Sequence, residues 1–174
     1  MTVDSVLFIA IAEIAGVFVG FGALISVTRR ADVEPAQLGA IRAVVTAGLT
    51  VVVAALIPVA MASYGVEGRT LWFFSSLAFL LLSWAVIGLS LRSASNRQLL
   101  GSLAKDAPVS SLFFWLALEL PIQVPLILAV LGLFRELDPA FYVTALAFNL
   151  FEAAFVLAQF VYAQAVSEDA SDSR

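Results

Sequence analysis

The stretch from residue 110 to residue 134 reads SSLFFWLALELPIQVPLILAVLGLF. Within it lie one charged side chain, Glu119, and two prolines, Pro121 and Pro125. A transmembrane helix needs about 20 consecutive and mainly apolar residues, so this stretch is long enough to cross a bilayer. It therefore predicts a membrane-spanning helix that holds an acid near its middle.

Four more apolar stretches of similar length accompany this one. Together they predict five helical crossings, at about residues 6–28, 40–63, 71–91, 110–134 and 140–165. The 174-residue chain is 62% hydrophobic and 13% charged, with a mean hydropathy of +1.04, whereas a soluble domain is about 45–50% apolar. We therefore expect an all-α integral membrane protein. Its single compact five-helix domain would cover residues 1–166, followed by a short solvated acidic tail, residues 167–174.

The basic residues predict how this bundle is oriented, because Lys and Arg are enriched in cytoplasmic connections. Two of the nine, Arg69 and Arg135, fall on one predicted side of the membrane. The other seven fall on the opposite side: Arg29, Arg30, Arg42, Arg92, Arg97, Lys105 and Arg174. The distribution predicts an outer N-terminus and a cytoplasmic C-terminus, in a membrane of the bacterial cytoplasmic type.

Missing residue types exclude several kinds of chemistry. The sequence contains no His and no Cys, which removes the usual ligands of zinc, haem and iron–sulfur clusters and every disulfide. The single lysine, Lys105, lies in a polar connection and not in a span. No basic stripe is present that would bind nucleic acid. We expect no cofactor, no metal centre and no enzymatic activity.

The fourth span has the strongest functional signal. Glu119 and Gln123 are four residues apart and share one helix face. Pro121 and Pro125 each remove a backbone donor, which leaves the carbonyl groups of Ala117 and Pro121 without their helical partners. In hydrocarbon, such carbonyls must be satisfied by a side chain, a water or an ion. The pattern indicates a binding place for a cation or a proton-carrying water chain, unless the prolines merely bend the helix.

The fifth span has a second polar stripe, formed by Asn149, Glu152 and Gln159. At about 1.5 Å per residue, Glu152 reaches a depth similar to that of the glutamate in the fourth span. Asp138 and Pro139 precede the apolar stretch and are expected to form its N-cap and first helical residue. The two mid-membrane glutamates are the expected centre of an ion path.

Glu13 lies nearer the predicted outer face, in the first span, and shares a helix face with Gly16 and Gly20. Glycines four residues apart allow helices to approach closely. Glu13 therefore has two interpretations. It lines a packed interior as the outer entry to the ion path, or it is protonated and hydrogen-bonded across a closely packed helix pair.

The sequence also predicts where three other polar or aromatic side chains lie. Arg42, in the second span, either extends to the lipid headgroups or acts as a counter-ion for Glu119 or Glu152. In the third span, Ser83 belongs to a seam of serines that is expected to pack helices. Trp84 is expected to fill the bundle interior.

The polar groups favour an ion-conducting or ion-coupled transport protein, because carboxyl groups at membrane depth are costly and mark ion or proton pathways. The expected ion-path residues are Glu119, Glu152, Glu13, Gln123, Asn149 and Gln159. The transported species is expected to be a proton or a small cation. Five short spans enclose little volume, so we also expect a homo-oligomer. The alternatives are an accessory or assembly subunit of a larger membrane complex and, less favoured, a lipid-modifying enzyme that uses a glutamate as acid or base.

Overall fold

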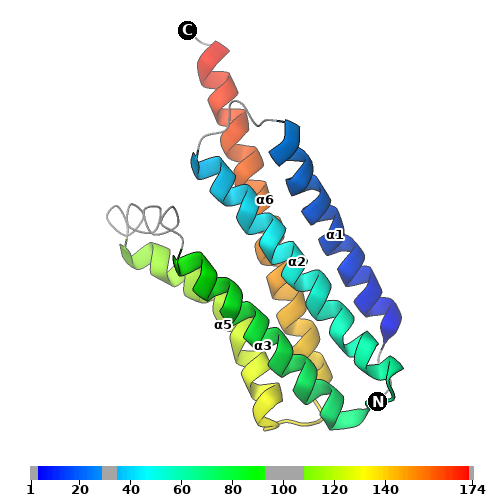
Figure 1. Ribbon diagram of the computed structural model, residues 1–174. Helices are drawn as coiled ribbons and strands as arrows, with labels where there is room; N and C mark the ends of the chain where they lie inside the picture. The colour runs from blue at the N-terminus through cyan, green and yellow to red at the C-terminus, as the bar shows by residue number, and fades with distance from the viewer. Residues whose placement is uncertain (1–3, 29–34, 93–107, 173–174) are drawn as a thin grey trace.

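The computed structural model describes residues 4–28, 35–92 and 108–172, and every regular element in these segments is an α-helix. The helices are α1 (Ser5–Thr28), α2 (Pro35–Ser63), α3 (Gly68–Arg92), α5 (Pro108–Leu131) and α6 (Asp138–Asp172). They run up and down beside one another (Figure 1). The chain thus has the all-α architecture that its apolar stretches predict.

Four of these helices are long and apolar enough to cross a membrane. The candidate spans are Ser5–Ile25, Ile41–Ser63, Gly68–Ser90 and Asp138–Gln159. In α5 the apolar segment found among the described residues is shorter, Leu116–Leu131. Large apolar side chains such as Val6, Val17 and Leu24 point outward and are exposed, as lipid-facing side chains are. Four apolar helices of this length indicate a membrane-embedded protein, while insertion, the five crossings and the orientation stay predictions.

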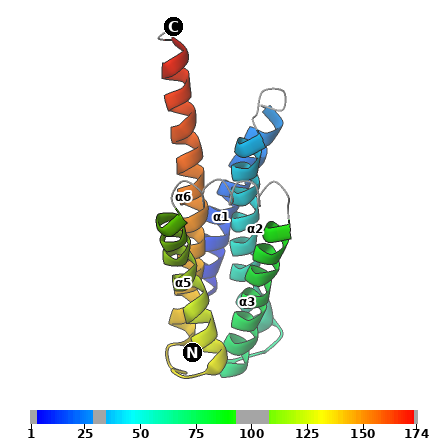
Figure 2. The ribbon, with the colours of Figure 1, turned by 90° about the vertical axis from the view of Figure 1, so that its left-hand side faces the viewer.

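Helices α2 and α6 occupy the centre of the assembly. Helix α6 contacts α1, α2, α3 and α5, whereas α2 contacts α1, α3 and α6. Helix α1 packs against α2 and α6 at the edge of the bundle, as Figures 1 and 2 show from two sides. We call the end with Asp4 and the two short connections, residues 64–67 and 132–137, the N-terminal end of the bundle, and the opposite end the C-terminal end.

Helix α5 ends at Leu131, three residues before the predicted end of the fourth span. Gly132 has a φ of 65°, a left-handed conformation that glycine adopts at little cost. Its N–H donates to the carbonyl of Ala129 at 3.2 Å, and the N–H of Leu133 donates to the carbonyl of Leu128 at 3.4 Å. These two bonds are those of a Schellman motif, which terminates a helix.

Helix α6 is longer than predicted. It begins at Asp138 and continues to Asp172, so it includes residues 167–172 of the predicted acidic tail. The sequence between Ala140 and Asp172 contains neither Gly nor Pro, and therefore nothing interrupts the helix where its apolar composition ends. The expected N-cap is also wrong: within the described chain, neither carboxyl oxygen of Asp138 has a hydrogen-bond partner.

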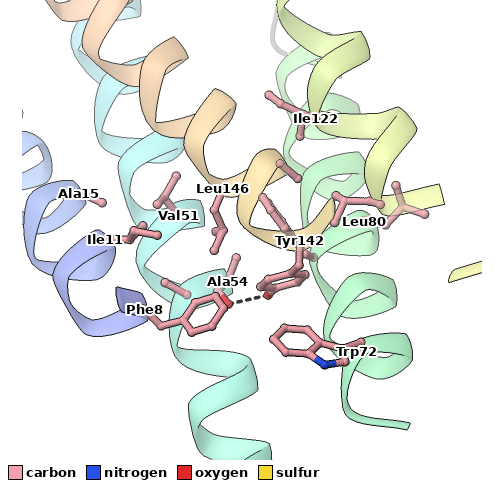
Figure 3. Close-up of a cluster of buried hydrophobic side chains, with 14 of the residues drawn as sticks. Phe8, Ile11, Ala15, Val51, Ala54, Trp72, Leu80, Ile122, Tyr142 and Leu146 are labelled. Carbon is pink, nitrogen blue, oxygen red and sulfur yellow. Dashed lines mark hydrogen bonds between the residues drawn. The ribbon is translucent and has the colours of Figure 1, made fainter. Parts of the chain in front are cut away.

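An aromatic cluster fills the bundle near its N-terminal end (Figure 3). The ring of Tyr142 on α6 lies 6.0 Å from Phe8, 5.9 Å from Trp72 and 5.8 Å from Phe79, measured between ring centroids. The Tyr142 hydroxyl donates a 2.6 Å hydrogen bond to the carbonyl oxygen of Ala54 on α2. These residues, called the aromatic cluster below, join α1, α2, α3 and α6.

The close approach of α1 and α2 depends on different glycines from those that the sequence pattern indicated. A Cβ atom on Gly48 would lie 2.8 Å from Val19 Cγ2, and one on Gly22 would lie equally close to a valine of α2. Around Gly16 and Gly20, by contrast, no described atom of another element lies within 4 Å of the corresponding position. The Gly16–Gly20 pair therefore faces away from α2, and it does not mediate helix packing within the described chain.

Candidate functional site

The side chain of Gln123 connects α5 to α3 in the middle of the bundle. Its Nε2 donates to Glu119 Oε2 at 3.1 Å and to Ser83 Oγ at 2.8 Å. Its Oε1 accepts a hydrogen bond from Trp84 Nε1 at 3.0 Å. Both ends of the amide are thus engaged, which holds Gln123 in one orientation and fixes one oxygen of the Glu119 carboxylate.

Glu152 on α6 lies beside Glu119. Helices α5 and α6 are packed against each other, and both glutamate side chains are half-buried. Glu119 is the charged residue that acts on Glu152, and the interaction is repulsive when both are ionised. The structure therefore places the two glutamates, which the sequence predicts to lie at similar depth, on helices that pack against each other.

Asn149 adds a neutral polar group to the same region. Its side chain is only 6% exposed, and its Oδ1 has no hydrogen-bond partner among the described residues. Three residues separate Asn149 from Glu152, which corresponds to about 60° around the helix and about 4.5 Å along it. Asn149 hence lies on the N-terminal side of the glutamate pair, on the buried face of α6.

Two buried hydroxyl groups complete the polar lining. Thr50 on α2 is 5% exposed, and its hydroxyl donates to the carbonyl oxygen of Thr46 at 2.8 Å. Ser83 on α3 is buried and accepts from Gln123. We call the resulting set the polar interior: Thr50, Ser83, Glu119, Gln123, Asn149 and Glu152. All four of the helices α2, α3, α5 and α6 contribute to it.

The aromatic cluster lies between this polar interior and the N-terminal end of the bundle. Along α6, Tyr142 precedes Asn149 by two helical turns on the same buried face. Along α3, Phe79 precedes Ser83 by about one turn. The interior therefore changes from aromatic to polar along the bundle axis, and the glutamates lie on the C-terminal side of the aromatic cluster.

Glu13 does not join this site. Its side chain is exposed on the surface of α1, together with Gly16 and Gly20. In the described segments, α1 packs against α2 and α6, and its contact with α3 is between the rings of Phe8 and Trp72 in the aromatic cluster. Glu13 therefore does not line the interior of this single chain, and its part in an ion path stays a prediction. The sequence pattern identified the shared face correctly but not the direction in which it points.

Gln159 and Arg42 also lie outside the polar interior. Both side chains are exposed. The exposed position of Arg42 favours the interpretation of a basic side chain that reaches outward from its helix, and its role as a counter-ion stays a prediction.

Both Pro121 and Pro125 lie within α5, which continues through them as one helix. In Figure 1 the first turns of α5 lean away from the direction of its later turns. The prolines therefore bend this helix without breaking it, next to the residue Glu119.

Two residues of the site were given other expected places. Trp84 was expected inside the bundle, but its side chain is 54% exposed while its indole nitrogen still donates to Gln123. The expected role of Ser83 is helix packing, and its hydroxyl joins α3 to α5 by accepting a hydrogen bond from the same amide. Sequence alone had no signal for either contact, because both depend on α3 and α5 lying side by side.

The chemical character of the polar interior is that of an acceptor-rich site. Gln123 Nε2 and the indole nitrogen of Trp84 already donate hydrogen bonds, whereas Asn149 Oδ1 has no partner among the described residues. The described residues contain no group of three or more His, Cys, Asp or Glu side chains that could hold a metal ion. Comparisons of the chain with protein-family models, with curated proteins and with solved structures gave no match.

Proposed function

We propose that this protein is an ion-conducting or ion-coupled membrane transport protein that moves a proton or a small cation. The observation that supports it is the half-buried Glu119, held by Gln123, on a helix that packs against α6 and its half-buried Glu152. Ionisable groups inside membrane helices are rare and costly, and in transport proteins they form proton relays and ion sites.

The residues have distinct roles in this proposal. Glu119 and Glu152 take up and release the ion, and Gln123 holds Glu119 in position through its 3.1 Å hydrogen bond. Asn149 provides a neutral oxygen beside the pair. Because the aromatic cluster fills the bundle on one side, the ion reaches the pair from the C-terminal side, and a change in packing of the cluster opens the other side.

The test is ion flux into proteoliposomes that contain the purified full chain and a pH-sensitive dye. Glu119→Gln and Glu152→Gln combined should abolish the flux, since neither amide can release a proton or balance a cation. Glu136→Gln serves as the matched control, because Glu136 lies exposed in the connection before α6. Flux that persists at the original rate in the double variant would refute the proposal.

A second candidate function is an accessory or assembly subunit of a larger membrane complex. Glu13 favours it, since an exposed carboxyl group on a candidate span needs a polar partner that another subunit would supply. A purified chain that aggregates alone supports this candidate. A stable homo-oligomer, which we propose as the transport form, argues against it.

A further inference from the structure

The side-chain amide of Gln123 can occupy its place in two orientations, because its oxygen and its NH₂ group are similar in size. In the structure the nitrogen faces Glu119 and Ser83, and the oxygen faces the indole nitrogen of Trp84. A half-turn about the last side-chain bond would exchange the two ends. The orientation matters, since only the NH₂ group can donate a hydrogen bond to Glu119.

The partners of this amide differ in whether they could pair with it after such a half-turn. A serine hydroxyl both donates and accepts, so Ser83 can pair with either end. Glu119 only accepts when it is ionised, but once protonated it can also donate to the amide oxygen. The indole nitrogen of Trp84 only donates, and it lies 3.0 Å from Gln123 Oε1. A turned amide would place two donors against each other at this position.

The location of Trp84 strengthens this constraint. Its side chain is 54% exposed, while its N–H points into the contact between α3 and α5. Trp84 lies within the candidate span Gly68–Ser90, and the hydrocarbon of a bilayer offers no other acceptor for the N–H. Loss of the bond to Gln123 Oε1 would therefore leave a polar group unpaired in apolar surroundings, which is unfavourable.

We infer that Trp84 is a positioning residue that acts through Gln123 and keeps this amide donating to Glu119, whether Glu119 is ionised or protonated. The inference rests on the proposed transport function, in which Glu119 and its neighbour Glu152 on α6 take up and release the ion. Without the indole N–H, the amide is free to turn when Glu119 is protonated and to accept a hydrogen bond from it. Each exchange of a proton would then require the amide to turn.

The infrared spectrum of the purified full chain, recorded over a pH titration, reports this contact. Because Oε2 of Glu119 accepts from Gln123, a proton is carried by Oε1, and Oε2 is then the carbonyl oxygen. The C=O stretch of a protonated carboxyl group has a lower frequency when its oxygen accepts a hydrogen bond. The band of Glu119 is the one that Glu119→Gln removes, and Trp84→Phe should move it to a higher frequency.

A second replacement separates the N–H group from the ring that carries it. Benzothiophene in place of the Trp84 indole keeps the size and shape of the ring but lacks the N–H, so it should move the band as Trp84→Phe does. Proton flux into proteoliposomes should fall about threefold to tenfold with either replacement, the equivalent of one hydrogen bond. Since Trp84 is half-exposed, circular dichroism and gel filtration should show folded chains in both cases.

Two matched variants control for other effects on α3. Phe74→Leu changes another exposed aromatic side chain, about 15 Å from Trp84 along the helix, and should alter neither the band nor the flux. Ser83→Ala removes one acceptor of the same amide but keeps the indole donor. The band should therefore stay at its lower frequency in Ser83→Ala.

The outcomes distinguish this inference from the proposed function. A band that does not move in either Trp84 replacement would overturn the inference, and so would a shift in Trp84→Phe that benzothiophene does not reproduce. An equal shift in Ser83→Ala would also overturn it. In these cases the proposed function stands as long as flux requires Glu119 and Glu152. A band that moves as expected, with flux that does not require the two glutamates, would refute the proposed function and leave the positioning of Glu119 in place.

Discussion

The aromatic cluster and the polar interior follow each other along the axis of one helical bundle. They differ in how completely their buried polar groups are hydrogen-bonded. In the aromatic cluster the buried hydroxyl of Tyr142 is paired, through its 2.6 Å bond to Ala54. In the polar interior Asn149 Oδ1 is unpaired within the described chain, and two like-charged carboxyl groups are neighbours. The buried polar group of the aromatic cluster is thus paired, whereas the polar interior holds an acceptor without a partner.

We therefore expect the aromatic cluster to contribute mainly to stability and the polar interior mainly to function. Lipid tails are as apolar as the side chains that they replace, so helices in a membrane associate through close packing and interhelical hydrogen bonds. The aromatic cluster supplies both, to four helices at once. Substitutions there should affect folding first, and substitutions in the polar interior should affect transport first.

The largest expected effect on stability comes from Tyr142→Ala. It removes a fully buried ring that contacts Phe8, Trp72 and Phe79, and such a loss costs about 3–5 kcal/mol in a packed core. The measurement is the free energy of unfolding in mixed detergent micelles. Tyr142→Phe, which keeps the ring and loses the bond to Ala54, should cost about 1–3 kcal/mol. Equal stability of both variants would show that ring packing contributes little.

Gln123→Leu, a substitution in the polar interior, should lower the free energy of unfolding by a smaller amount. The substitution keeps the approximate volume but removes three hydrogen bonds and leaves Ser83, Glu119 and Trp84 without their partner. We expect a loss of about 1–3 kcal/mol in unfolding free energy, and a larger proportional loss of ion flux. Gln123→Glu is the control for side-chain shape. Unchanged flux in Gln123→Leu would contradict the positioning role of this amide.

Gly132→Ala tests the connection that precedes α6, at the N-terminal end. Alanine at a φ of 65° costs about 1–2 kcal/mol, and its Cβ would also collide with the guanidinium group of Arg69. Arg69→Ala in the same chain should recover the part of the loss that is due to the collision. Thermal unfolding of both single variants and the double variant measures this coupling. Full additivity would mean that Arg69 moves away freely.

The smallest effect on transport is expected from Glu13→Gln. Glu13 lies exposed on α1, away from the polar interior, so ion flux per folded protein should equal that of the unchanged chain. Glu119→Gln, measured in the same proteoliposomes, provides the contrast. A comparable loss of flux in both variants would place Glu13 in the ion path and end the distinction between the two acids.

Sequence periodicity predicted much of this arrangement. The positions of the helices follow from apolar stretches, because a span requires a minimum length of apolar residues. The meeting of Glu119 with Glu152 follows from depth along two helices joined by a short connection, and such helices are neighbours. Helix α6 exceeded its predicted range because the end of an apolar stretch is not the end of a helix.

The direction of each helix face could not be predicted in the same way. Glu13, Gly16 and Gly20 share a face, but the sequence of α1 alone does not reveal on which side α2 lies. Trp84 was misplaced for a related reason, since an indole ring can remain exposed while its nitrogen bonds to a neighbouring helix. The side to which a helix face points depends on how two helices pack, and the sequence of one helix does not determine it.

Because α6 is long and uninterrupted, a small tilt in its middle displaces its C-terminal end by a larger distance. Between Glu152 and Asp172 the helix runs for twenty residues, or about 30 Å, and in Figure 1 its end projects beyond the other helices. A rigid rod of that length turns a tilt of about 10° at the glutamate into a displacement of roughly 5 Å at its tip. A spectroscopic label on that tip would therefore report a small tilt of α6 at Glu152 as a larger displacement.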